Sequence, residues 1–256
     1  MIESSSPDMQ ADPQPQLVRI PRHVDVPRAT HIILGFTVAV YILQFLSISF
    51  HGYAVPGLDW LELYGARFNE AMRAGEWWRF ITPVFLHGSP MHIFFNMYAL
   101  LSVGTFLEKQ FGHGRFVALY FLAAFSGNVF SFLFAREGGF SVGASTAIFG
   151  LIAAEYIFFY QNRELFGSFA RQAMGNTIMI LVINLVIGLS PGIDNWGHIG
   201  GLLGGAIFAW FASPRWEVSG ILPHVQLEDA REPREVITGA LLVIVVFAGL
   251  AARELF

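Results

Sequence analysis

The chain has 256 residues, of which 54% are hydrophobic and only 13% are charged, about half the charged fraction of a typical soluble domain. The formal net charge of −4 provides no basic field for nucleic acid, and the absence of cysteine excludes disulfides, thiolate nucleophiles and cysteine-based metal sites. Together with a mean hydropathy of +0.54, these values indicate a polytopic, all-α membrane protein.

The chain divides into a polar beginning, an apolar body and an apolar end. Residues 1–18 are polar and contain three consecutive serines and three prolines, and we expect a disordered cytoplasmic tail over 1–29. A transmembrane helix needs about 20 mostly apolar residues, and seven stretches qualify: 30–50, 91–109, 115–135, 144–161, 173–190, 197–212 and 236–252. We expect a six-helix core at 30–213 with a long first loop at 52–90, an acidic linker at 214–235, and a seventh helix within 236–256.

The distribution of positive charge predicts the orientation of these spans. With the N-terminus in the cytoplasm, ten of the 15 Arg and Lys residues fall in inner segments and five in outer ones. Arginine outnumbers lysine 14 to one, which is typical of a GC-rich bacterial genome. We therefore expect a bacterial inner membrane protein whose second, fourth and sixth spans begin on the outer side.

Four polar side chains then share one depth near the outer surface. His92 and Asn96 lie in the first turns of the second span, Ser145 begins the fourth, and His198 begins the sixth. Ionisable groups in lipid are costly and mark functional sites. Matching depths predict that the serine and the histidine meet and act as a nucleophile and its base.

The residue types fit acyl-transfer chemistry. A serine hydroxyl becomes an effective nucleophile when a base removes its proton, and His198 is placed to do so. His92, Asn96 and the backbone N–H of Ser145 at a helix N-terminus are candidate donors to an oxyanion. Asp194 is the one acidic residue near His198, and since it precedes the helix, a Ser/His dyad is more economical than a triad.

Small residues in the fourth and sixth spans allow the close approach that this pairing requires. The fourth carries Gly143, Ala144, Ala147 and Gly150, and the sixth carries Gly201-x-x-x-Gly205 overlapping Gly200-x-x-x-Gly204. Phe149 lies one turn after Ser145, where its ring could brace His198.

At this point the motifs resemble those of the rhomboid intramembrane serine proteases. They occur in family order over about 76–210: Glu76-Trp77-Trp78-Arg79 with Phe80 to His87 in the first loop, His87-x4-His92-x3-Asn96, Glu108 between Gly104 and Gly112, Gly143-Ala144-Ser145, and His198-x-x-Gly201-x3-Gly205.

The resemblance implies a rhomboid-like six-helix bundle with an added seventh transmembrane helix. It implies Ser145 as nucleophile, His198 as general base, and an oxyanion hole of His92, Asn96 and the Ser145 amide. The structural residues around the site would be Trp78, Arg79, His87, Glu108, Phe149, Gly143, Gly201 and Gly205. The implied substrates are transmembrane segments of other proteins in the lipid bilayer, reached laterally past the fifth span, with no metal or other cofactor.

One position departs from the family pattern. Thr146 follows the serine where the family usually has glycine, and a β-branched residue restricts the local backbone. An inactive rhomboid relative that binds membrane proteins is therefore the second interpretation. A transporter or channel is the third, and it is disfavoured because the polar groups share one depth and do not line a path.

Overall fold

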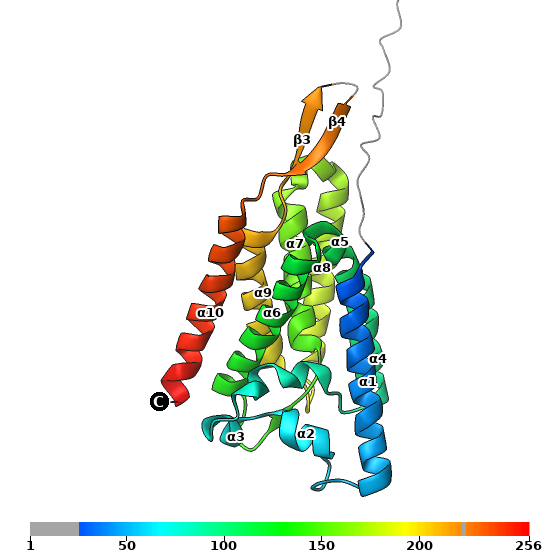
Figure 1. Cartoon of the computed structure of the whole chain (residues 1–256), viewed down its shortest axis with the longest axis vertical. Coiled ribbons are helices and arrows are strands. Elements are labelled where there is room, and N and C mark those ends of the chain that lie inside the picture. The colour runs from blue at the N-terminus through cyan, green and yellow to red at the C-terminus, as the bar shows by residue number, and fades with distance from the viewer. Residues whose placement is uncertain (1–25, 222–223, 256) are drawn as a thin grey trace, which may run out of the picture.

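The computed structural model describes residues 26–221 and 224–255, and most of this part is helical (Figure 1). The long helices run side by side between two ends of a bundle: α1 (Arg28–His51), α6 (His113–Phe134), α7 (Ser145–Gln161), α8 (Arg163–Ile187), α9 (Asn195–Ala212) and α10 (Pro233–Leu255). A further continuous helix joins α4 (Pro90–Ala99), the π-helical η3 (Leu100–Gly104) and α5 (Thr105–Phe111). The predicted polytopic helical class is confirmed.

Five helical segments of the described chain are long and apolar enough to cross a membrane: Arg28–His51, Pro90–Phe111, His113–Phe134, Arg163–Ile187 and Pro233–Leu255. The other two expected spans correspond to α7 and α9, which have 17 and 18 residues and lie in the middle of the bundle. The predicted tail lies mostly outside the described residues, and α1 begins at Arg28.

The helix α8 begins ten residues before the expected 173, at Arg163. Its first turns are polar, so hydropathy alone did not assign them to a span. Gly167 interrupts this segment with φ 54° and ψ −124°, a conformation that glycine adopts without steric cost.

The first long loop, residues 52–90, is ordered into short elements, and we call it loop 1. They are α2 (Trp60–Gly65), β1 (Arg67–Phe68), α3 (Asn69–Arg73), and the 3₁₀ turns η1 (Trp77–Phe80) and η2 (Thr82–Phe85). Strand β1 pairs antiparallel with β2 (Phe140–Ser141), which lies four residues before Ser145. Loop 1 is thereby tied to the segment that leads into α7, and we call this end of the bundle the loop-1 end.

The opposite end carries a β-hairpin that the sequence argument did not predict. Strands β3 (Trp216–Ile221) and β4 (His224–Asp229) pair antiparallel within the expected linker 214–235 (Figure 1). The sequence predicted only an acidic linker here. In the structure, Val225, Leu227 and Asp229 alternate with more exposed neighbours, which is the two-residue period of a strand.

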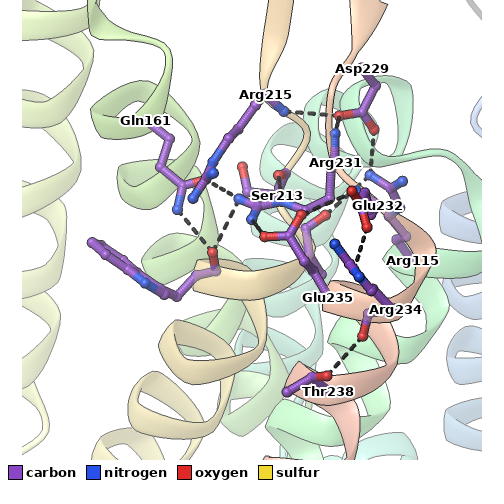
Figure 2. Close-up of polar contacts among 12 residues, drawn as sticks. Arg115, Gln161, Ser213, Arg215, Asp229, Arg231, Glu232, Arg234, Glu235 and Thr238 are labelled. Atoms are coloured by element: carbon purple, nitrogen blue, oxygen red, sulfur yellow. Dashed lines mark hydrogen bonds and ion pairs between the residues drawn. The ribbon is translucent and has the colours of Figure 1, made fainter.

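A buried arginine connects this hairpin end to three helices, as Figure 2 shows. Arg231 is 4% exposed and donates to the backbone oxygens of Ser213 (2.9 Å) and Trp210 (3.2 Å) at the end of α9. It also donates to Gln161 at the end of α7 (2.8 Å) and pairs with Glu235 of α10 (2.6 Å). A cation here complements the helix C-termini and fixes α10 to the core.

Glycines bring α9 against its two central neighbours, α6 and α7. A Cβ at Gly201 would overlap the backbone oxygen of Thr146, and one at Gly205 would lie 2.6 Å from the backbone oxygen of Gly150. A Cβ at Gly204 would overlap the hydroxyl of Ser126 on α6. Backbone therefore meets backbone along this seam, which is the geometry of small-residue helix packing.

Candidate active site

The serine lies at the first residue of α7, immediately after a glycine that the backbone requires. Gly143 has φ 128°, a region that side chains disfavour, and its N–H donates to the backbone oxygen of Pro83 in loop 1 (2.9 Å). The backbone oxygen of Ala144 accepts from Ile148 as the helix starts. The sharp turn places the half-buried Ser145 at the N-terminus of α7, where the helix dipole favours negative charge.

The histidine approaches this serine from the first turn of α9. His198 is 7% exposed, and its Nε2 lies 2.9 Å from Ser145 Oγ. The ring of Phe149 stacks on the imidazole with centroids 4.2 Å apart and planes 10° apart. The shared depth of Ser145 and His198 predicted this contact, and the Phe149 ring fixes the plane of the imidazole.

The acidic residue near the histidine is engaged elsewhere. Asp194 is the N-cap of α9 and accepts from the Gly197 N–H (2.9 Å). Its second oxygen accepts a short hydrogen bond from the Ser131 hydroxyl of α6. His198 Nδ1 has no hydrogen-bond partner among the described residues. The Asp194 carboxylate is thus used at the start of α9, and Ser145 and His198 form a two-residue pair.

The two candidate oxyanion donors differ in their surroundings. His92 reaches the nucleophile turn, since a Cβ at Gly143 would lie 2.6 Å from His92 Nε2 and 3.7 Å from Ser145 Oγ. Asn96 is 7% exposed, one turn further along α4, and its amide donates to the backbone oxygen of His92 (3.0 Å). The second N–H of that amide remains for another acceptor.

Thr146 is accommodated by two glycines. Its side chain is buried between α6 and α9, where a Cβ at Gly127 would lie 2.6 Å from its Cβ, and one at Gly197 would lie 3.0 Å from its Cγ2. Its hydroxyl has no hydrogen-bond partner within the described chain. The bulk absent from these glycines makes room for the branched side chain beside the nucleophile.

Three residues expected around the site lie outside the dyad's contacts. Exposed Trp78 donates through Nε1 to the backbone oxygen of Tyr64 (2.9 Å). Buried Arg79 donates to the backbone oxygens of Leu63 in α2 and Ala66 just after it. Both side chains therefore stabilise the fold of loop 1. Glu108 is not brought to the site: it lies 16 residues, or roughly 24 Å of helix, beyond His92. It accepts from the backbone N–H of Thr30 (2.7 Å) at the start of α1.

Glu155, which the sequence argument left unassigned, faces α8. Thr177 Oγ1 donates to its carboxylate over 3.4 Å.

Among the described residues, no three His, Asp or Glu side chains group so that they could hold a metal ion.

Sequence reasoning missed a polar cluster behind the site. Gln44 of α1, Asp59 at the N-cap of α2, and Glu62 within α2 are 2%, 1% and 6% exposed. Gln44 is the detectable signal, because an amide inside an apolar span needs buried partners.

Fold and site together define a class: a polytopic helical membrane protein that pairs a serine hydroxyl with a histidine imidazole at the loop-1 end. Comparison with known proteins agrees, because residues 74–215 match the Rhomboid domain. The chain belongs to the rhomboid family.

Relatives of known name support this assignment. The chain is 41% identical over 169 residues to the rhomboid protease GluP of Bacillus subtilis, which covers 66% of this chain and 32% of that protein. It is 35% identical over 184 residues to the mitochondrial RHOMBOID-like protein 6 of Arabidopsis thaliana, covering 71% and 59%. An inactive RHOMBOID-like protein 8 from the same plant is 34% identical over 161 residues, covering 62% and 45%. The matched region thus spans less than two thirds of each of these relatives.

Proposed function

We propose that the protein is an intramembrane serine endopeptidase that hydrolyses peptide bonds in or near transmembrane segments of other membrane proteins. The observation that carries this proposal is the 2.9 Å distance between Ser145 Oγ and His198 Nε2. Membership of a family that includes a protease relative supports it.

The two side chains would act in sequence. His198 Nε2 takes the proton as Ser145 Oγ attacks the substrate carbonyl carbon, and it then gives this proton to the departing amine. The product is an ester between Ser145 and the N-terminal part of the substrate. A water molecule, deprotonated by the same imidazole, hydrolyses this ester and restores the serine.

The charge on the carbonyl oxygen would be stabilised by donors at the nucleophile turn. The Ser145 backbone N–H and His92 adjoin the reacting atom, and Asn96 follows one turn away. Each good donor in such a hole contributes roughly 10²- to 10³-fold to the rate. None of these steps requires a cofactor.

Substrates would approach laterally through the bilayer, past α8. This helix buries only Ala170 and Thr177 among its 25 residues. Positive charge favours a cytoplasmic N-terminus and a site near the outer face of a bacterial inner membrane. Cleavage would then occur near the outer end of the substrate helix.

Two substitutions test the proposal. Ser145→Ala and His198→Ala should each lower cleavage of a tagged transmembrane substrate in proteoliposomes by about 10⁴-fold or more, while thermal unfolding stays cooperative. A fluorophosphonate should label the wild-type protein and not Ser145→Ala. Equal cleavage by wild type and both variants would reject the mechanism.

The second candidate is an inactive relative that binds transmembrane proteins. It is favoured by the bulk of Thr146, whose hydroxyl has no hydrogen-bond partner among the described residues. Reagent labelling separates the two candidates. Folded wild-type protein without labelling, together with labelling of Thr146→Gly, would support the inactive candidate. Labelling of both at similar rates would support the protease.

A further inference from the structure

A buried polar cluster joins α1 to the nucleophile turn, and the chemistry proposed above leaves it unused. Its centre is Gln44, which lies in the loop-1 half of α1 among apolar residues and is 2% exposed. An amide buried in a membrane span costs free energy unless it is hydrogen-bonded. The partners of Gln44 therefore indicate what it does.

Gln44 binds both backbone groups of one loop residue. The His87 N–H donates to its Oε1 (3.1 Å), and its Nε2 donates to the His87 carbonyl (3.4 Å). The same Nε2 donates to Asp59 (2.8 Å), the N-cap of α2, whose side chain accepts from the Leu61 and Glu62 amides. One side chain thus fixes His87 relative to α1 and α2.

His87 in turn contacts the residues that flank the nucleophile. It is 1% exposed, and its Nε2 accepts from the N–H of Ala144 (3.4 Å), the residue before Ser145. Its ring meets the His92 ring edge-on, with centroids 4.9 Å apart. The His87 ring thereby contacts the nucleophile turn and a candidate oxyanion donor at once.

The protonation state of His87 is compatible with this role. Burial, together with the neighbouring His92, lowers the pKa of His87 to about 3. The ring is therefore neutral at physiological pH, and Nε2 keeps the lone pair that accepts from Ala144.

We propose that Gln44 is a positioning residue for the Ser145 site, acting through His87 to hold the Gly143–Ala144 turn and His92 in register. This inference rests on the proposed function. Gln44 lies in α1, outside the 74–215 segment that matches the family domain, yet two consecutive hydrogen bonds connect it to the residue beside the nucleophile.

The main variant is Gln44→Met, which keeps volume and apolar compatibility and removes all three hydrogen bonds. Misplacement of a reacting group by about 1 Å costs on the order of 10²-fold, so we expect kcat to fall 10- to 100-fold while KM stays within about twofold. The matched control is Thr37→Val on the same helix, since Thr37 is equally buried and its hydroxyl bonds only to its own helix at Ile33. The control should retain wild-type kcat and KM.

A double-mutant cycle tests the route through His87. His87→Phe keeps a ring of similar shape and removes the acceptor for Ala144. Adding Gln44→Met to His87→Phe should cause less than a twofold further loss of kcat. If the kcat losses of the two single variants multiply in the double variant, Gln44 does not act through His87.

Amide hydrogen exchange of residues 140–146 supplies a readout that does not depend on catalysis. Gln44→Met should exchange faster there, and Thr37→Val should not. If the wild type neither cleaves nor labels, the proposed function fails while the exchange comparison still tests the contact. An active wild type with unchanged kcat in Gln44→Met, a change in KM alone, or unchanged exchange would overturn the inference. If Gln44→Met does not fold, Gln44→Leu takes its place under the same criteria.

Discussion

The helices α9 and α8 both pack on α7, and they do so in opposite ways. Nine of the 18 residues of α9 are buried, five of them glycines, whereas α8 buries two of its 25 residues. Backbone contact along α9 holds His198 against Ser145, and α8 lies at the rim with exposed apolar side chains.

The difference teaches where this bundle is rigid. Interdigitated backbone along α7 and α9 leaves few alternative positions for the dyad. Few buried contacts and the break at Gly167 make α8 the helix that can move at the lowest free-energy cost. The Ser145–His198 contact therefore lies between tightly packed helices, whereas α8 lies at the loosely packed rim.

The largest effect should come from filling the α9 seam. Gly201→Ala places a methyl group on the Thr146 backbone oxygen, and α7 and α9 must separate. We expect a loss of about 3 kcal/mol or more in unfolding free energy and loss of cleavage. Gly175→Ala on α8 is the matched control, because nothing lies within 4 Å of its Cβ position. Comparable thermal midpoints for the two variants would contradict the difference in packing between α9 and α8.

The next effect concerns the hairpin end of α9. Arg231→Met removes the arginine donor to the backbone oxygen of Ser213 and one of two donors to that of Trp210, which Gln161 Nε2 also bonds. It should lower the free energy of unfolding by about 2–4 kcal/mol. Arg234→Met is the control, since that side chain is 82% exposed. Denaturation in detergent would measure both. Equal losses of unfolding free energy in the two variants would mean that Arg231 does not stabilise the hairpin end of α9.

A smaller effect on stability is expected at loop 1, whose buried contacts are polar, unlike the glycine contacts of α9. Burial and the adjacent Asp59 raise the pKa of Glu62 from 4.5 to about 7. The folded state therefore binds this proton more tightly than the unfolded state between about pH 4.5 and 7, and its contribution to stability falls as pH rises through that window.

Glu62→Gln removes that contribution. Relative to wild type, the thermal midpoint of Glu62→Gln should increase from pH 5 to pH 8. A difference between variant and wild type that is the same at both pH values would contradict the assignment.

The smallest effect should come from releasing α8. Thr177→Val removes the side-chain hydrogen bond to Glu155, and a single interhelical hydrogen bond contributes about 0.6 kcal/mol. If movement of α8 limits access, cleavage should speed up by at most about threefold. Slower cleavage would show that α8 must stay docked. Ile178→Val, exposed on the same helix, is the control.

Much of the fold and of the candidate site followed from the sequence. Hydropathy predicted the long apolar helices, and the shared depth of Ser145 and His198 predicted an approach that the glycines make possible. These features are local, or depend only on helix number and direction. The family assignment was confirmed by the comparison.

The remaining features depend on tertiary contacts that sequence patterns do not carry. Gln44 gains its role from His87, 43 positions away, and Arg231 gains its role from the ends of α7 and α9. Thr146 appeared to be a liability because the compensating space, at Gly127 and Gly197, belongs to two other helices. The β3–β4 hairpin was obscured by its acidic composition.

Asp194 is hydrogen-bonded to Ser131 and Gly197 and not to His198, and this bears on the rate of turnover. Where an aspartate orients the histidine of a serine protease, disrupting it slows turnover about 10⁴-fold. Here Phe149 stacks on the imidazole, and His198 Nδ1 has no hydrogen-bond partner among the described residues. For the proposed protease activity, we therefore expect slow turnover. Most membrane proteins that reach the site would diffuse away before a bond is cleaved. The time that each protein spends at the site would then determine which ones are cut.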